Sequence, residues 1–235
     1  MEQTPKNYQS TGKGYEDLKK INDDWRRYIH HKSSGLLTDE NFFIFGKQLS
    51  GKKSCFKSVF KALYPEHEDS TVKSENIYCK RLTDRIFLWK MATIAQSSDL
   101  IDQIEHRNGS ENEKLPQCDL CVLLIAVNEN DEEYFKTMRE SIEYLRSKSV
   151  PFVIWITKVD LLSSNFKDSI GKIVEKISND NNETILASLV LPIVNLRENF
   201  SLLKMYFVLR ILAESLKIKI KIQNTPSETA QASPT

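Results

Sequence analysis

The sequence predicts an α/β fold in which a mostly parallel sheet carries helices on both faces. Three long apolar runs indicate strands that are buried on both sides: CDLCVLLIAV (118–127), PFVIWIT (151–157) and ILASLVLPIV (185–194). The segments between these runs have apolar residues at the three- and four-residue steps of a helix. Strands that alternate with helices form βαβ units, and right-handed crossovers bring the carboxyl ends of the strands to one edge of the sheet. Ligands usually bind at that edge.

The remaining elements follow from the same patterns. Residues 15–32 place Tyr15, Leu18, Ile21 and Trp25 on one face of a helix that precedes the main domain. The other expected elements are, in chain order, a short strand at 41–46, a helix at 52–63, strands at 76–82 and 84–90, an irregular stretch at 91–117, helices at about 132–148 and 165–177, and a long helix from about 200.

Two polar segments have simple structural interpretations. NENDEEY (128–134) is interpreted as a solvated helix start, where acidic residues suit the helix dipole. LKIKIKIQ (216–223) alternates apolar residues with lysine, which is typical of a lysine-protected edge strand or of a frayed helix end.

These elements divide the chain into a disordered start (1–14), a helical lead-in (15–40), the main domain (41–216) and a mostly disordered tail (217–235). No apolar run approaches the roughly 20 residues needed to cross a bilayer, and the first residues lack the apolar core of a signal peptide. The net charge of +1 gives no field that favours nucleic acid or anionic lipid. We therefore expect a cytoplasmic protein that binds neither nucleic acid nor membrane.

The four cysteines agree with this compartment. Cys118 and Cys121 form a single C-x-x-C pair at the start of a very apolar strand, on which residues three apart point to opposite faces. Without a second pair or a suitably spaced histidine, a zinc site is not expected. All four cysteines, including Cys55 and Cys79, are predicted to be buried free thiols.

The first strand ends in GKQLSGKK (46–53), which follows the Gly, four residues, Gly-Lys spacing of a phosphate-binding loop. In such a loop, backbone N–H groups surround phosphate oxygens at the positive end of the following helix. Gly51 permits close approach, and Lys52 would reach the β and γ oxygens. The alternative is a solvated, lysine-rich turn. The candidate phosphate-binding residues are Gly46, Ser50, Gly51, Lys52, Lys53 and Ser54.

The strand at 151–157 ends in TKVD (157–160), which has the form of the guanine-reading motif N/T-K-x-D. Asp160 can accept hydrogen bonds from the N1 and N2 donors of guanine, which adenine does not offer. The alternative is a strand-end lysine and an aspartate that caps a helix. A loop after the last strand stands where a backbone N–H would reach guanine O6. The candidate base-binding residues are Thr157, Lys158, Asp160, Val194 and Asn195.

The order of these motifs resembles that of a translation-factor-type G domain, over roughly residues 41–216. Within that class the chain is most similar to the interferon-induced protein 44-like group. SGKKSCFKSVF (50–60) resembles its G-K-S-S-F-F-N-S-V, DSTVKSENIYCK (69–80) its switch segment, and VLPIVNLREN (190–199) its P-V-K-N-Y loop. The resemblance implies a P-loop G-domain fold and a cytosolic, GTP-binding protein associated with innate immune responses.

Two departures from that pattern concern the metal. In a G domain, Mg²⁺ is held by the hydroxyl that follows the loop lysine and, through water, by the Asp of D-x-x-G after the third strand. Lys53 replaces the hydroxyl, and Lys90, Met91 and Ala92 stand where D-x-x-G is expected. Positive charge opposes Mg²⁺, although it can itself neutralise phosphate. Mg²⁺ is therefore not expected as a cofactor, and GTP or GDP is the expected ligand. Thr71 holds the place of a switch threonine without a metal to coordinate.

The sequence thus predicts a pseudo-GTPase: a regulatory or interaction module for protein partners, with weak or Mg²⁺-independent guanine-nucleotide binding and little or no hydrolysis. Two alternatives stay open, a scaffold that has lost nucleotide binding and a hydrolysing GTPase with an unusual metal site. The direction of Lys53 separates two cases. If it points into the loop, it should partly replace the metal and make binding insensitive to EDTA. If it points to solvent, nucleotide affinity should be low.

Overall fold

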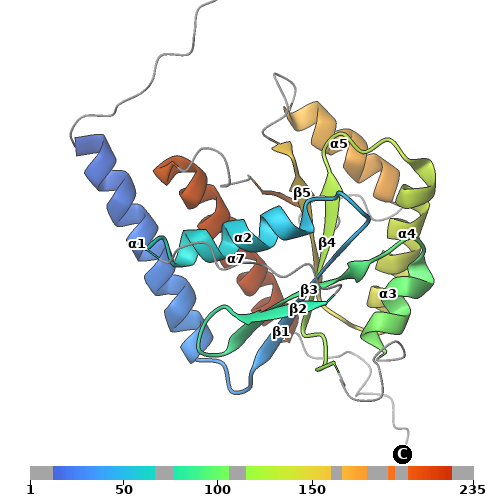
Figure 1. Ribbon diagram of the computed structural model, residues 1–235, viewed down its shortest axis with the longest axis horizontal. Coiled ribbons are helices and arrows are strands. Elements are labelled where there is room, and N and C mark those ends of the chain that lie inside the picture. Colours follow the sequence, from blue (N-terminus) through green and yellow to red (C-terminus); the bar gives the residue numbers. More distant parts are fainter. Residues whose placement is uncertain are drawn as a thin grey trace, which may run out of the picture.

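The computed structural model of the chain describes residues 13–66, 77–105, 115–159, 166–178, 190–193 and 201–223. Within these residues, six strands form one sheet in the order β2-β3-β1-β4-β5-β6 (Figure 1). The strands are β1 (Glu40–Gly46), β2 (Tyr78–Arg81), β3 (Ile86–Thr93), β4 (Leu120–Ala126), β5 (Phe152–Thr157) and β6 (Val190–Pro192). Neighbouring strands are parallel except for the antiparallel pair β2 and β3. The predicted mostly parallel sheet is confirmed.

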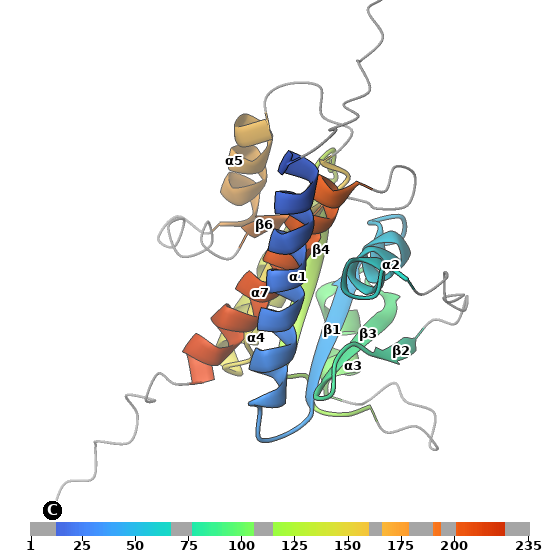
Figure 2. The same ribbon diagram turned by 90° about the vertical axis from the view of Figure 1, so that its left-hand side faces the viewer.

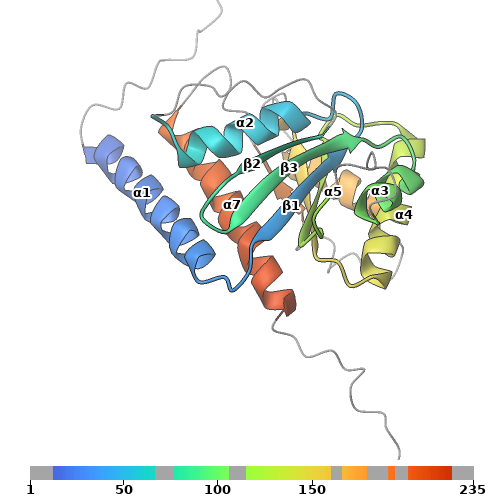
Figure 3. The same ribbon diagram turned by 60° about the horizontal axis from the view of Figure 1, so that its bottom comes forward.

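Helices cover both faces of this sheet, as expected. They are α1 (Lys13–Ser34), α2 (Lys52–Leu63), α3 (Ser97–Ile104), α4 (Glu132–Ser147), α5 (Phe166–Ile177) and α7 (Leu202–Gln223). α2 and α7 lie on one face, and α3, α4 and α5 lie on the other (Figure 1). The lead-in helix α1 lies alongside α7, on the side away from the sheet (Figures 2 and 3). There the side-chain amide of Asn22 donates a hydrogen bond of 2.9 Å to the carbonyl of Leu202.

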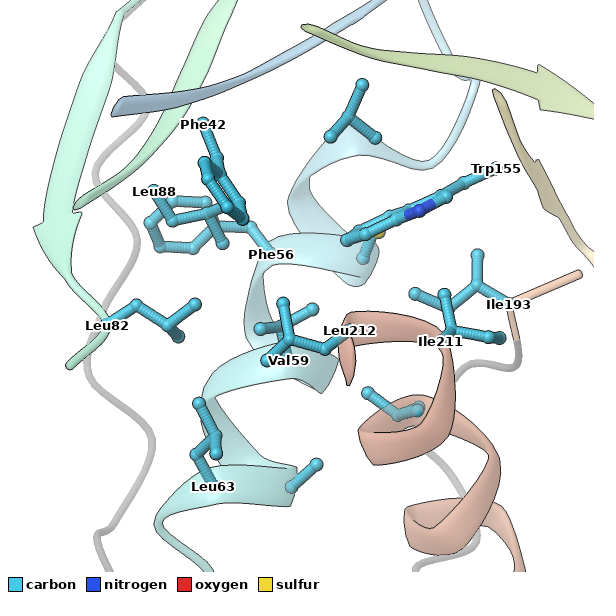
Figure 4. Packing of buried hydrophobic residues seen from close by; sticks show 14 of the residues in the cluster. Phe42, Phe56, Val59, Leu63, Leu82, Leu88, Trp155, Ile193, Ile211 and Leu212 are labelled. Atoms are coloured by element: carbon cyan, nitrogen blue, oxygen red, sulfur yellow. The ribbon is translucent and has the colours of Figure 1, made fainter. Parts of the chain in front are cut away.

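The two core layers follow from the alternation of side chains along the strands. Phe42 and Ile44 of β1 point to the face covered by α2 and α7, whereas Phe43 and Phe45 point to the opposite face. All four side chains are fully buried, which explains why the sequence of β1 is a continuous apolar run. Figure 4 shows the first layer, where side chains from the sheet, α2 and α7 converge; its labelled members include Phe42, Val59, Trp155 and Leu212.

The C-terminal helix is fixed to the sheet by a buried ion pair. Lys219 of α7 contacts the carboxylate of Glu40 at the beginning of β1, and both side chains are almost completely buried. LKIKIKIQ forms the end of the helix α7, which continues to Gln223. The buried contact between Lys219 and Glu40 holds this part of the helix against the sheet. The strand-like alternation of this segment does not determine its structure.

Two further expectations need correction. The stretch at 91–117 contains the helix α3, whose start is closed by a capping box in which Gln96 and Asp99 satisfy each other's backbone N–H groups. β3 also extends beyond the predicted end at Lys90, to Thr93. The four strands expected to share one sheet do so, although of residues 185–194 only 190–193 belong to the described part of the chain. The expected disordered ends lie mostly outside the described residues.

The described residues contain no helix that is long and apolar enough to cross a bilayer. The four cysteines are free, and Cys79 is half-buried whereas the other three are buried. Burial raises the pKa of the thiols of Cys55 and Cys121 well above the usual range, so both stay protonated at neutral pH. Within the described ranges, no group of three or more His, Cys, Asp or Glu side chains is placed to hold a metal ion.

Candidate nucleotide site

The loop between β1 and α2 has the geometry that its two glycines predict. At Gly46 an added Cβ would collide with Ser50 Oγ and would lie 3.2 Å from the Cβ of Leu124. Gly51 has a φ of 94°, in the left-handed region that favours glycine, and it directly precedes the first residue of α2. The loop therefore folds tightly under the N-terminus of α2, where the helix dipole favours an anion.

The loop lysine is held by oxygen atoms of the protein. Lys52 Nζ donates to the carbonyls of Gly46 and Lys47, the latter at 3.0 Å, and to Thr93 Oγ1 at 3.4 Å. Burial, together with the nearby charge of Lys90, lowers the pKa of Lys52 to about 8. A bound anion would raise this pKa again, since it favours the charged form.

Lys53 does not enter the loop. Its side chain is exposed in the first turn of α2, whereas Ser54 beside it is half-buried. The first turn of α2 carries no acidic residue either. The ammonium group of Lys53 therefore faces solvent, which is the case for which the sequence predicts low nucleotide affinity.

The end of β5 contacts the phosphate-binding loop directly. Thr157 Oγ1 donates to the carbonyl of Ser50 at 2.7 Å. An added Cβ at Gly51 would lie 3.5 Å from Thr157 Oγ1. Lys158 follows with a φ of 59° and is half-buried beside the loop. Thr157 and Lys158 thus meet the loop at one edge of the sheet, as the order of the motifs predicts. Asp160, Val194, Asn195 and Thr71 lie outside the described residues.

The carboxyl end of β3 differs from the expected position of D-x-x-G. Lys90 pairs with Ile44 inside the sheet, and the strand reaches the edge only at Thr93, opposite Gly46. The four residues that begin at this edge are therefore TIAQ (93–96). A threonine stands where the metal-linked aspartate is expected, and a glutamine stands where the glycine is expected. The expected start of D-x-x-G thus moves from Lys90 to Thr93, and neither residue is a carboxylate.

A cavity of about 600 Å³ lies at this edge of the sheet. It is lined by residues 47–50, 93–95, 126, 128, 129, 131, 134 and 158. We call residues 47–50 the loop wall, and the set Asn128, Glu129, Asp131 and Tyr134 the acidic wall. The acidic wall comes from the turn between β4 and α4 and from the first turn of α4, and it was not predicted as part of the site. Its sequence signal was the cluster of acidic residues in NENDEEY, which lies at the carboxyl end of a buried strand.

The two walls are joined through Lys47. Its ammonium group lies 2.7 Å from Glu129 Oε1 and 3.4 Å from Asp131 Oδ2, and 4.9 Å from the centre of the Tyr134 ring. Its backbone N–H donates to the hydroxyl of Tyr134 at 3.3 Å, and that hydroxyl donates to the carbonyl of Leu124 at 2.7 Å. Asp131 also accepts from the N–H groups of Glu133 and Tyr134 and so caps α4.

Charges of both signs therefore face the same cavity. Lys47 and Lys158 contribute two positive charges to its lining, and Glu129 and Asp131 contribute two negative charges. An anion in this space is attracted by the lysines and repelled by the carboxylates. The arrangement can hold a phosphate group, but with less electrostatic stabilisation than the loop alone would give.

Comparison with known proteins supports the same fold. No family model matches the chain, and no curated protein matches it in sequence. Among solved structures, a dimerization-deficient mutant of Toc33 from Arabidopsis thaliana has a TM-score of 0.57 and 10% identity, over 87% of this chain and 93% of that one. A probable GTP-binding protein, engB, has a TM-score of 0.50 and 12% identity, over 77% and 99%.

A variant of SsGBP also matches, with a TM-score of 0.44 and 17% identity over 88% of this chain, which spans 66% of that protein's length. The similarity to Toc33 and engB is one of fold alone, because the identities are low. The strand order, the single antiparallel strand pair and the loop between β1 and α2 fit it. The chain has the fold of a P-loop G domain.

Proposed function

We propose that this chain is a pseudo-GTPase, a G-domain protein that serves as a regulatory or interaction module for protein partners. Guanine nucleotide is bound weakly and without Mg²⁺, and hydrolysis is slow or absent. The proposal includes the cytoplasmic location expected from the sequence. Membership of the interferon-induced protein 44-like group, and the innate-immune association that it implies, stays a prediction from the motifs.

The observation that carries this proposal is the missing metal site. The residue after the loop lysine, Lys53, has no oxygen in its side chain and faces solvent. At the end of β3, Thr93 offers a hydroxyl where a G domain uses a carboxylate. Phosphoryl transfer depends on a metal ion and a positioned water for most of its electrostatic stabilisation. Without them, the site binds phosphate better than it catalyses phosphoryl transfer.

The contact between β5 and the loop supports a preference for guanine. Because Thr157 bonds to the loop through Ser50, the segment TKVD begins beside the phosphate position, as a base-reading motif requires. Lys158 borders the cavity, where its alkyl stem can cover a base. Asp160 then supplies the acceptor for the guanine N1 and N2 donors. The loop centred on Val194 and Asn195 would contribute the backbone N–H to O6.

A scaffold without nucleotide is the second candidate, and the acidic wall favours it. Glu129 and Asp131 line the cavity beside the loop, where their charges would repel a phosphate group. Lys52 already has three oxygen partners and a pKa of only about 8. A hydrolysing GTPase is the third candidate, and it would need a metal site built from other residues.

Calorimetry with GTP, GDP and ATP, each with Mg²⁺ and with EDTA, separates these candidates. The proposal predicts measurable guanine-nucleotide binding that is tighter than ATP binding and that EDTA does not abolish. Asp160→Asn should shift the preference towards xanthine nucleotides, because an amide can accept from N1–H and donate to the 2-carbonyl of xanthine, where guanine has an amino donor. Equal affinities for GTP and ATP would remove the guanine assignment, and no binding of either would favour the scaffold.

A further inference from the structure

The contact between Lys47 and Glu129 places a carboxylate where it competes with a phosphate group. Lys47 follows the first glycine of the loop, and its ammonium group borders the same cavity as the rest of the loop wall. The ammonium group of Lys47 lies 2.7 Å from Glu129 Oε1. Asp131 Oδ2 follows at 3.4 Å. The charge of Lys47 is thus already neutralised by two carboxylates of the same chain.

Glu129 is well placed to hold this position. Its side chain is only 6% exposed, and the same oxygen atom also accepts the backbone N–H groups of Asn130 and Asp131, each at 3.1 Å. These three contacts hold the carboxylate of Glu129 at a defined point of the cavity lining.

We infer that Glu129 is a built-in competitor of phosphate for Lys47. This inference rests on the proposed function, since it requires a phosphate group at the loop. When a polyphosphate enters, its terminal group replaces Glu129 as the partner of Lys47. The released carboxylate turns away from the like charge, and its hydrogen bonds from the N–H groups of Asn130 and Asp131 weaken. The competition weakens binding in the resting state, and it makes Lys47 a phosphate-binding residue only after the exchange.

The exchange of Glu129 for phosphate at Lys47 would change contacts at the start of α4. Lys47 is bound to α4 through its ammonium group on Asp131 and through its N–H on the hydroxyl of Tyr134. The Tyr134 hydroxyl in turn bonds to Leu124 of β4. A phosphate that draws Lys47 away changes the contacts of both the cap and the first turn of α4. Occupancy of the cavity is thereby communicated to the turn between β4 and α4.

The test is a double-mutant cycle on Glu129 and Lys47, with inorganic triphosphate and GTP as ligands in calorimetry. Glu129→Gln keeps the shape and the carbonyl acceptor but removes the charge. We expect it to tighten binding of both ligands about tenfold, since one repulsion is lost and one cation is freed. Lys47→Ala alone should change affinity by less than about threefold, because Lys47 is occupied in the parent. Lys47→Ala in the Glu129→Gln background should remove the part of the gain that the freed cation supplies.

Glu133→Gln is the matched control, because this exposed carboxylate lies four residues after Glu129, in the first turn of α4, and pairs with Lys136 at 3.5 Å. It should leave both affinities unchanged. Hydrogen exchange gives a second readout: triphosphate should alter exchange of the Lys47, Asn130 and Asp131 amides in the parent protein. If Glu129→Gln leaves the affinity unchanged while Lys52→Ala abolishes binding, the inference is wrong and the proposed function stands. If no variant binds either ligand, both are wrong.

Discussion

The two walls of the cavity have opposite chemistry. The loop wall lies in the turn between β1 and α2, between the glycines at 46 and 51, and it presents Lys47 to the cavity. The acidic wall is the turn between β4 and α4, and it presents Glu129 and Asp131 to the same space. A phosphate group is attracted by one wall and repelled by the other. The comparison shows that the spacing of a phosphate-binding loop does not by itself define a strong phosphate site.

The largest expected effect is the loss of the loop lysine. Lys52→Ala removes the cation that the carbonyls of Gly46 and Lys47 hold in the loop. Hydrogen bonds between charged groups contribute about 1.5–3 kcal/mol, so we expect about a hundredfold loss of triphosphate affinity. Calorimetry measures this loss. The control Lys172→Ala removes an equal charge from the exposed side of α5 and should have no effect; an equal loss in both variants would mean that only overall charge matters.

The packing of the loop wall is tested by Gly46→Ala. The new methyl group would collide with Ser50 Oγ and crowd Leu124, so the free energy of unfolding should fall by about 2 kcal/mol. Chemical denaturation monitored by fluorescence gives the value. Gly171→Ala is the counterpart, since no atom lies within 4 Å of its added Cβ in the helix α5. That variant should be more stable than the parent by about 0.5–1 kcal/mol. A Gly46→Ala protein of parental stability would contradict the loop geometry.

The pH dependence of binding tests the state of Lys52. Its pKa of about 8 in the free protein means that the ammonium form is nearly complete at pH 7 and mostly lost at pH 9. An anion binds the charged form, so binding takes up a proton above pH 8 and affinity should fall about tenfold from pH 7 to pH 9. Calorimetry in two buffers of different ionisation enthalpy would detect the proton uptake. A flat profile would show that Lys52 titrates outside this range or does not contact the anion.

The smallest expected effect concerns the second carboxylate of the acidic wall. Asp131→Asn keeps an oxygen to cap α4 but removes one charge that faces the anion, so triphosphate affinity should rise about threefold. Asp131→Ala should raise affinity in the same way and also lower the melting temperature, because the cap is lost. A fall in affinity with Asp131→Asn would indicate that this carboxylate helps to bind the ligand.

Most of the fold could be predicted because it depends on local patterns. The apolar runs at 118–127 and 151–157 are short and lie between segments with helical periodicity, which favours buried strands, and they form β4 and β5. LKIKIKIQ could not be assigned, because the partner that decides it, Glu40, is far away in the sequence. The end of β3 was misplaced by three residues for a similar reason: its pairing with β1, not its own pattern, sets the boundary at Thr93.

The candidate site divides in the same way. The glycines and Lys52 were predictable because the physics of a phosphate-binding loop requires them at fixed spacing. The acidic wall was missed, since a helix start rich in Asp and Glu has a sufficient local explanation in the helix dipole. Only the sheet topology, which brings the carboxyl ends of β1 and β4 side by side, places Glu129 next to Lys47.

The most direct test of the pseudo-GTPase proposal is GTP turnover by the parent protein, measured with Mg²⁺ and with EDTA. Lys53 faces solvent and Thr93 replaces the carboxylate, so we expect turnover near the uncatalysed level in both conditions. Lys53→Ser should not create a fast enzyme, because the end of β3 would still lack its carboxylate. Mg²⁺-dependent turnover at or above about one per minute, which already requires a substantial reduction of the barrier, would contradict the proposal.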